Sequence, residues 1–167
     1  MKLPDITLLI ATAVAALMAG LFFAYTVSVS PGLGRLPNIE YLKAMQSINS
    51  AIQNAVFFLC FFGALILLPL SAVQQFKLDK MVFVLLLAAS FCYIIGVFLV
   101  TVSINVPLNE MLDKYDPESL SSRDLNLLRG KFEGRWNTWN NVRTFASFVA
   151  VILAIAACMI KKNTPQL

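Results

Sequence analysis

The chain has 167 residues, of which 59% are hydrophobic and 13% charged; its mean hydropathy is +0.76 and its net charge +4. A soluble domain of this length is far less apolar, so the composition excludes a soluble globular protein, and the length allows one domain. The basic residues are scattered among acidic ones instead of forming a stripe, which argues against nucleic acid as a partner. We therefore expect one integral membrane domain, 1–167, whose main partner is the lipid bilayer.

Four apolar stretches have the length of a membrane-spanning helix, which needs about 20 residues. They cover about 6–29, 55–73, 81–106 and 144–160, and none contains Asp, Glu, Lys or Arg. The first stretch follows Lys2, as a signal peptide would, but its apolar run is longer than the roughly 7–15 residues of a signal sequence. The pattern therefore predicts an all-α, four-helix bundle with the first helix retained.

Small residues recur at helical spacing in the first and fourth stretches. The first carries Thr12, Ala16, Gly20 and Ala24, and the fourth carries Ala146, Ala150 and Ala154. Such stripes let helix backbones approach closely in a membrane, so we expect these two helices to pack against each other.

Turn-forming residues divide the rest of the chain. Prolines and glycines in 30–37 end the first helix, and Asn38 is expected to cap the next. No breaker separates the amphipathic segment 38–54 from the span 55–73, so one long helix is predicted there. Pro107 should kink the third helix. Ser121 or Ser122 should cap a helix, about 123–143, that continues into the fourth span. Helices 2 and 4 are thus expected to extend beyond the bilayer on one side.

The distribution of lysines predicts the orientation. With four spans, both termini and the 74–80 link share one side, where short segments carry Lys2, Lys77, Lys80, Lys161 and Lys162. This pattern favours the cytoplasm for both termini, although the opposite side holds more basic residues in total, most of them among acids. The expected location is a bacterial inner membrane. Cys60, Cys92 and Cys158 each lie in a different span and are interpreted as core residues.

Polar side chains gather where helix 1 ends, helix 2 starts, helix 3 ends and helix 4 starts, which connectivity places at one membrane face. They are Gln46, Asn49, Gln53, Asn105, Asn109, Asn140 and Arg143. Polar groups at membrane depth are costly and tend to face the bundle interior or a water-filled cavity, so we predict a one-sided polar pocket. Alternatively, the amides only join helices and cap the break at Pro107.

Two tryptophans and two acids lie beside this polar set. Trp136 and Trp139 are expected to anchor the helix at the lipid interface, with pocket lining as the alternative. Glu110 and Asp113 are interpreted as solvated charges or as partners of Arg143 and Arg135.

The chain contains no histidine, so imidazole ligation of haem, copper, zinc or a di-iron centre is ruled out. No nucleotide-binding or nucleophile-elbow motif is present either. We therefore expect no metal and no cofactor. Chemistry in the pocket would use amides, Arg and Tyr to stabilise an anion, or an acidic side chain at the mouth as base.

Four segments together carry a family resemblance: Gly20 to Tyr25 with Pro31-Gly32-Leu33, Ala44 to Asn49 with Ile52-Gln53-Asn54, Asn105-Val106-Pro107-Leu108-Asn109, and Trp136 to Thr144. They resemble the anthrone-oxygenase-like family of small four-helix membrane proteins, whose bacterial members are mostly uncharacterised. The resemblance implies oxygenation of an anthrone-like polyketide to a quinone without metal or flavin.

On this interpretation the catalytic residues are Arg143, Asn140, Asn109 and Glu110, and the ligand-binding residues are Gln46, Asn49, Gln53, Asn105, Trp136 and Trp139. Because histidine is absent, the role of base falls to Glu110, Asp113 or Tyr41. The ligand would be a small aromatic, quinone-like or polyketide-like molecule.

A different class of function is a non-enzymatic membrane scaffold or partner-binding subunit. It predicts that the amides pair with one another or with a partner chain and leave no cavity. A transporter is disfavoured because no charge lies mid-membrane. The sequence is compatible with a monomer and with an oligomer.

Overall fold

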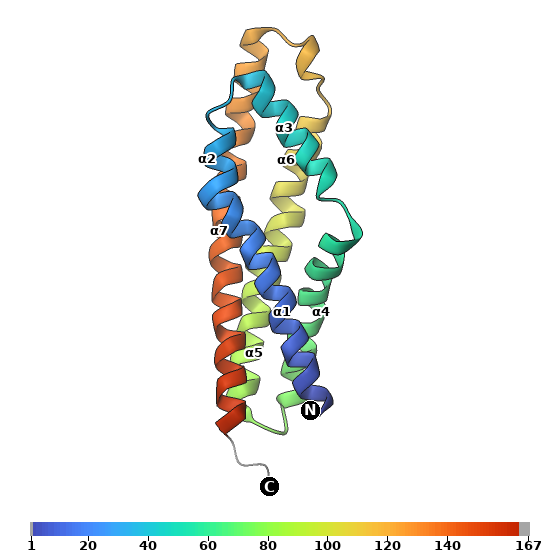
Figure 1. Cartoon of the computed structure of the whole chain (residues 1–167), viewed down its shortest axis with the longest axis vertical. Coiled ribbons are helices and arrows are strands. Elements are labelled where there is room, and N and C mark those ends of the chain that lie inside the picture. The colour runs from blue at the N-terminus through green and yellow to red at the C-terminus, as the bar shows by residue number, and fades with distance from the viewer. Residues whose placement is uncertain (1, 164–167) are drawn as a thin grey trace.

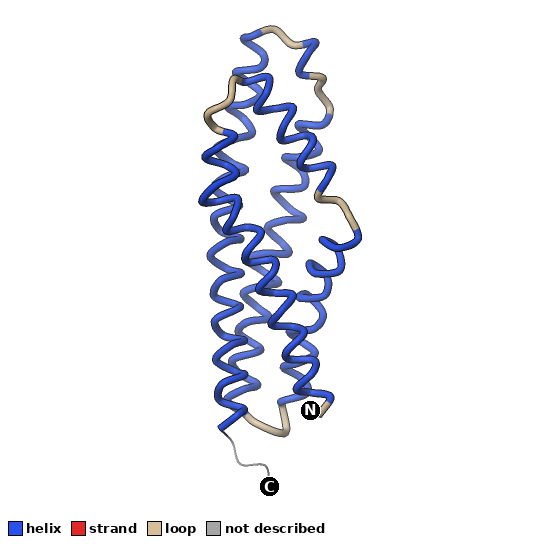
Figure 2. The backbone as a smooth tube through the Cα atoms, viewed as in Figure 1, coloured by secondary structure: helices blue, strands red, loops and turns tan. Residues whose placement is uncertain are grey.

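The computed structural model describes residues 2–163, which form helices joined by short loops and contain no strand (Figures 1 and 2). The α-helices are α1 (Leu3–Ala24), α2 (Ser30–Leu33), α3 (Asn38–Ala51), α4 (Ala55–Gln75), α5 (Lys80–Tyr93), α6 (Val106–Asp113) and α7 (Ser122–Asn163). Wider π-helical segments are η1 (Tyr25–Val29), η2 (Ile94–Leu99) and η3 (Thr101–Asn105), and η4 (Pro117–Ser119) is a 3₁₀ turn. The predicted all-α bundle is confirmed.

Four long helices form the bundle, with α1 next to α4, α4 next to α5, α5 next to α7 and α7 next to α1. In the described residues, four helical stretches are long and apolar enough to cross a membrane: Leu3–Leu33, Ala55–Gln75, Lys80–Asp113 and Ser122–Ile160. Large apolar side chains such as Leu9, Phe62, Phe91 and Phe148 are exposed on their outer faces. In water such a surface would be a liability, whereas in lipid it is the expected one. These features indicate an integral membrane protein.

Alanines hold the bundle together, but they are not all the predicted ones. On α1 the buried small residues are Ala11, Ala15 and Ala19, whereas Ala16 and Gly20 are exposed. The expected stripe on α1 is therefore wrong by one residue, because the face toward α4 and α7 also has to bury larger side chains at neighbouring positions. The packing of α1 against α7 itself is confirmed, with Ala150 and Ala154 fully buried.

The expected continuous second helix is also wrong. α3 ends at Ala51 and α4 begins at Ala55, so the chain leaves the helix between them. The side chain of Asn54 stabilises the break: its Oδ1 accepts from the Phe57 amide (3.0 Å), and its Nδ2 donates to the Ala51 carbonyl (2.9 Å). Asn54 therefore caps the last turn of α3 and the first turn of α4 at once, which stabilises the break relative to a continuous helix. Figure 2 shows this break as the loop between α3 and α4.

The fourth helix behaves as predicted. α7 runs without interruption from Ser122 to Asn163. At its start, the Ser121 hydroxyl accepts from the Asp124 amide (3.2 Å) and donates to the Asp124 carboxylate (2.6 Å). The continuous path from 123–143 into the last span is therefore confirmed; where the bilayer begins along it stays a prediction.

Two π-helical segments precede prolines at the same offset. η1 covers the second to sixth residues before Pro31, and η3 covers the second to sixth residues before Pro107. A proline ring clashes with the carbonyl four residues earlier, here that of Val27 or Ser103, and a widened turn relieves the clash. The helix at Pro107 thus widens instead of simply breaking, and both segments lie next to the polar side chains described below.

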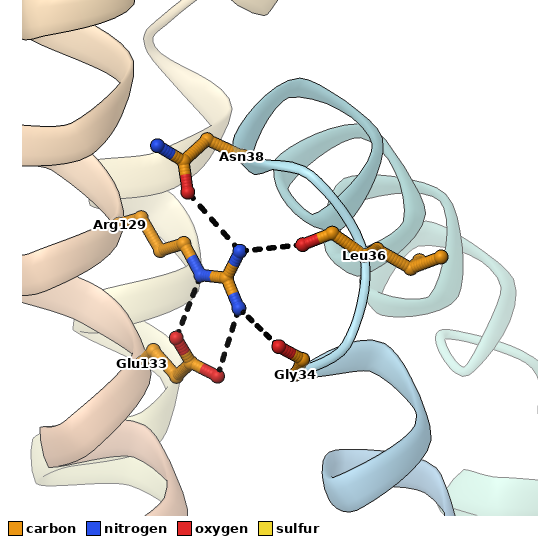
Figure 3. Close-up of polar contacts among 5 residues, drawn as sticks. All are labelled: Gly34, Leu36, Asn38, Arg129 and Glu133. Carbon is orange, nitrogen blue, oxygen red and sulfur yellow. Dashed lines mark hydrogen bonds and ion pairs between the residues drawn. The ribbon is translucent and has the colours of Figure 1, made fainter.

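A clasp fixes the α2–α3 loop to α7 (Figure 3). Arg129 donates to the carbonyls of Leu36 (2.7 Å) and Gly34 (2.8 Å), to the Asn38 side chain (3.1 Å), and twice to Glu133 (2.7 and 3.3 Å). The expectation that Asn38 caps α3 is wrong, because its side chain accepts from Arg129 and the capping position is Pro37. Arg129 is a structural residue whose N–H groups are well occupied.

Candidate functional site

A pocket with a volume of about 340 Å³ lies where α1, the α3–α4 break, η3, α6 and α7 meet. In Figure 1 the α3–α4 break, which borders the pocket, lies about midway along the long axis of the molecule, away from the N-terminus and the α4–α5 link. The volume falls within the range of small-molecule sites, about 300–1,000 Å³. Its polar or charged lining residues are Asn49, Gln53, Thr101, Asn105, Asn109, Glu110, Asp113, Asn140 and Arg143; its apolar or aromatic ones are Leu21, Phe22, Tyr25, Ile52, Phe57, Phe58, Val106 and Trp136.

Two helical stripes supply most of the polar wall. Trp136, Asn140 and Arg143 follow one face of α7 at i, i+4 and i+7. Thr101, Asn105 and Asn109 lie at four-residue intervals from η3 into α6 and make the facing stripe. The hydrogen bond from Trp136 Nε1 to Asn109 Oδ1 (2.8 Å) ties the two stripes together.

Arg143 is the most unusual residue of the pocket. It is 6% exposed, and its guanidinium lies 4.7 Å from the Phe22 ring centroid and 5.4 Å from that of Trp136. Nη2 donates to Asn140 Oδ1 (3.1 Å) and Nη1 to Thr101 Oγ1 (3.4 Å), whereas Nε has no protein partner. Among the described residues, the ion pairs are Lys43–Glu118 and Arg129–Glu133, so no carboxylate neutralises Arg143. A buried cation held only by neutral groups is suited to an anionic ligand.

The neighbouring amides are only partly satisfied. Asn140 is fixed by donating to the Phe22 carbonyl (3.2 Å) and to Thr26 Oγ1 (3.1 Å), which leaves its oxygen for Arg143. Asn105 donates to the Trp136 carbonyl at 3.4 Å, but its Oδ1 is buried without a protein partner. Asn49 is buried as well, and its Nδ2 lacks a partner. Unpaired buried donors and acceptors are costly, so these atoms are candidates for ligand or water contacts.

Aromatic rings form the apolar wall. The Tyr25 and Trp136 rings lie 5.3 Å apart at 48°, with Phe22 below the guanidinium and Phe57 and Phe58 from the start of α4. The Tyr25 and Trp136 rings are in contact with each other at this distance and form one aromatic surface of the pocket, against which a flat aromatic molecule can pack. The pocket can therefore hold an aromatic body while offering hydrogen bonds and a positive charge to its polar edge.

Two carboxylates line the pocket from α6. Glu110 and Asp113 are both exposed, so they are solvated and can exchange protons with water. Tyr41, the third candidate base, is absent from the lining: it is 1% exposed and packs under Arg129 and beside Phe132. Burial, aided by the Glu133 charge, raises the pKa of Tyr41, so its phenol stays protonated and cannot accept a proton. The carboxylates are the better candidates.

The family model for anthrone oxygenase matches residues 55–153, more than half of the chain. The chain belongs to the anthrone oxygenase family. No curated protein and no solved structure matched it. The matched segment of this family member includes Asn105, Asn109, Asn140 and Arg143, while α1 and α3 complete the pocket from outside the segment.

The predicted site residues of this family member are distributed unequally around the pocket. Those that line it are Asn49, Gln53, Asn105, Asn109, Glu110, Trp136, Asn140 and Arg143. Gln46 does not, because its amide donates to the carbonyls of Leu112 (3.0 Å) and Tyr115 (2.9 Å) and holds α6 against α3. Trp139 is half-buried and also outside the lining. Trp136 is 4% exposed, so the expectation that it anchors the helix in lipid is wrong.

Several residues that line the pocket were not predicted from the sequence. Phe22 and Tyr25 were hidden in an apolar run, and Ile52 and Phe57 in a segment expected to be one helix. Thr101 could have been found, because it lies four residues before Asn105 on the same helical face. Of the two interpretations of Glu110 and Asp113, pairing with Arg143 or Arg135 is not found among the described residues, where both carboxylates are exposed.

The residues that the structure describes contain no cluster of metal-ligating side chains. In residues 2–163, no three His, Cys, Asp or Glu side chains are grouped so that they could hold an ion. The groups that face the pocket are amides, hydroxyls, carboxylates and one guanidinium.

Proposed function

We propose that this protein binds a flat, weakly acidic aromatic molecule of the anthrone type as its anion, and oxygenates it to a quinone with dioxygen. Arg143 is the residue on which the proposal depends. Its buried guanidinium lacks a carboxylate partner among the described residues and retains an unpaired Nε at a pocket with aromatic walls. An aromatic enolate would satisfy both the charge and the shape.

The reaction balances as one substrate and one dioxygen giving one quinone and one water. A base removes a proton from the reactive methylene, and the resulting carbanion is delocalised onto the ring oxygen as an enolate. The carbanion passes one electron to dioxygen, and the two radicals combine into a C–O bond. Protonation gives a hydroperoxide. Loss of the remaining C–H proton then forms the new carbonyl as the O–O bond breaks, and the distal oxygen leaves as water.

The side chains have separable roles in this scheme. Arg143 would hold the enolate oxygen and so lower the free energy of deprotonation, the largest contribution expected from a preorganised positive group. Asn140 fixes the guanidinium through Nη2, and Asn109 fixes the Trp136 ring through its indole N–H. Glu110 would act as base, with Asp113 as the alternative on the next turn of α6.

A panel of anthrones tests the proposal. Purified protein is incubated with each compound under air while quinone absorbance and oxygen uptake are followed. We expect turnover with one oxygen consumed per quinone, a large loss in Arg143→Ala and Glu110→Gln, and a smaller loss in Asp113→Asn. Equal rates for wild type, Arg143→Ala and empty detergent would refute the enzymatic function.

The scaffold function retains one observation in its favour, since Asn109, Asn105 and Asn140 already bond across helices. It predicts that Arg143→Ala weakens assembly with a partner protein. It also predicts that anthrones do not change the melting temperature of the wild type or of the variant. Failure of every anthrone to bind or to raise the melting temperature would favour this second function.

A further inference from the structure

A second, apolar cavity adjoins the pocket. This groove has a volume of about 230 Å³ and is lined by Leu17, Met18, Leu21, Ile52, Asn54, Val56, Phe57 and Cys60. Leu21, Ile52 and Phe57 line the pocket as well, so the two cavities meet at these three side chains. Each of the three is half-buried; Ile52 lies in the α3–α4 break and Phe57 in the first turn of α4.

The groove offers nothing to a polar ligand. Its one polar side chain, Asn54, already uses Oδ1 on the Phe57 amide and Nδ2 on the Ala51 carbonyl. Its rim is formed by Leu17 and Val56, which are 63% and 72% exposed on two membrane-spanning helices. The groove therefore opens toward lipid and suits hydrocarbon alone.

The two cavities have complementary chemistry. The pocket holds a buried guanidinium and, within the described part of the chain, unpaired atoms on Asn49, Asn105 and Arg143, whereas the groove has only apolar atoms to offer. From Leu17 to Leu21, and from Val56 to Cys60, the groove follows four helical steps, or about 6 Å of helix axis. That length fits the first few carbons of an alkyl chain.

Resting on the proposed function, we propose that the ligand is an amphiphile: an acidic aromatic ring in the pocket with an alkyl chain that passes between Leu21, Ile52 and Phe57 into the groove. The ligand would reach the pocket from the bilayer. Because lipid is as apolar as the groove, the chain adds specificity and orientation more than free energy of transfer.

Two probes separate the ring site from the chain site: an acidic hydroxynaphthoquinone without a chain, and the same ring with a saturated undecyl chain. Binding is measured calorimetrically in detergent, with the partition of each probe into micelles determined separately. Leu17→Trp and Val56→Trp fill the groove from exposed positions on its two walls. Leu9→Trp and Leu59→Trp are matched controls, 57% and 74% exposed on the same helices but outside the groove.

Both probes should bind the wild type and lose affinity in Arg143→Met. The groove variants should weaken the undecyl probe and leave the chain-free probe unchanged, while the controls change neither. If the groove variants weaken neither probe, or both equally, the amphiphile proposal is overturned and the ring site stands. If neither probe binds in an Arg143-dependent way, the proposed function and this inference fail together.

Discussion

Replacement of Arg143 by Met separates a binding role from a structural one. A guanidinium has five N–H donors, and protein atoms take two of them, so three remain for a ligand. Loss of a single oxyanion donor typically lowers kcat by about 10²–10³, equivalent to about 2.7–4 kcal/mol. We expect Arg143→Met to lower kcat/KM for the best anthrone by at least about 100-fold on this scale.

Stability should respond in the opposite sense. Met removes a buried charge whose desolvation costs several kcal/mol, and the chief loss is the partner of Asn140 Oδ1, about 1–3 kcal/mol. The thermal midpoint of ligand-free Arg143→Met in detergent should therefore equal or exceed that of the wild type.

Oxygen uptake and thermal melting on the same preparations measure both effects. Arg143→Lys keeps the charge with fewer donors, so its turnover should lie between those of the wild type and Arg143→Met. The matched control is Arg135→Met, because Arg135 is an exposed arginine on the same helix. Wild-type turnover in Arg143→Met, or a loss of turnover that only follows a lower melting temperature, would show that Arg143 has no binding role.

Three further substitutions test the packing, the widened helix and the clasp. Gly96→Ala places a methyl group 2.3 Å from Ala146 Cβ and should destabilise by about 1–3 kcal/mol in thermal melts; adding Ala146→Gly should restore stability, and no restoration would contradict the contact. In Pro107→Ala, residues 101–105 should return to α-helix, which turns Asn105 away from the pocket and reduces turnover. Pro69→Ala is the control: Pro69 lies in an α-helix that is not widened, so this substitution should leave turnover unchanged. Arg129→Met should lower the free energy of unfolding by at least about 1.5–3 kcal/mol, the contribution of one hydrogen bond to a charged group. The folded fraction should keep its ligand affinity. A reduced affinity in the folded fraction would show that Arg129 contributes to the site.

The bundle, and the grouping of the polar side chains at one end of the spans, could both be predicted from the sequence, because they follow from the lengths of the apolar runs and from the connectivity. Arg143 and Asn140 could be assigned to a pocket since α7 is one uninterrupted helix, on which spacing fixes the face. The break at 52–54 could not, because it contains no proline or glycine and depends on one capping side chain, Asn54.

The aromatic wall escaped prediction for a related reason. Trp136 at a membrane boundary has two compatible environments, lipid headgroups or a pocket, and only packing of Tyr25 and Phe132 against it decides between them. Gln46 resembled a pocket amide by spacing, but the carbonyls freed at the end of α6 compete for it. Local spacing predicts which residues share a face, whereas the partners that satisfy them come from distant segments.

Formation of the substrate anion without oxygen separates the proposed role of Arg143 from every later step of the reaction. Purified protein is mixed anaerobically with an anthrone, and the absorbance spectrum is recorded before and after air is admitted. We expect the wild-type protein to generate the anthrolate spectrum in proportion to its sites, Arg143→Met not to generate it, and air to convert the anion into quinone. A bound anthrone that stays neutral in the wild type, or an anion that forms equally in Arg143→Met, would contradict stabilisation of the substrate anion by Arg143.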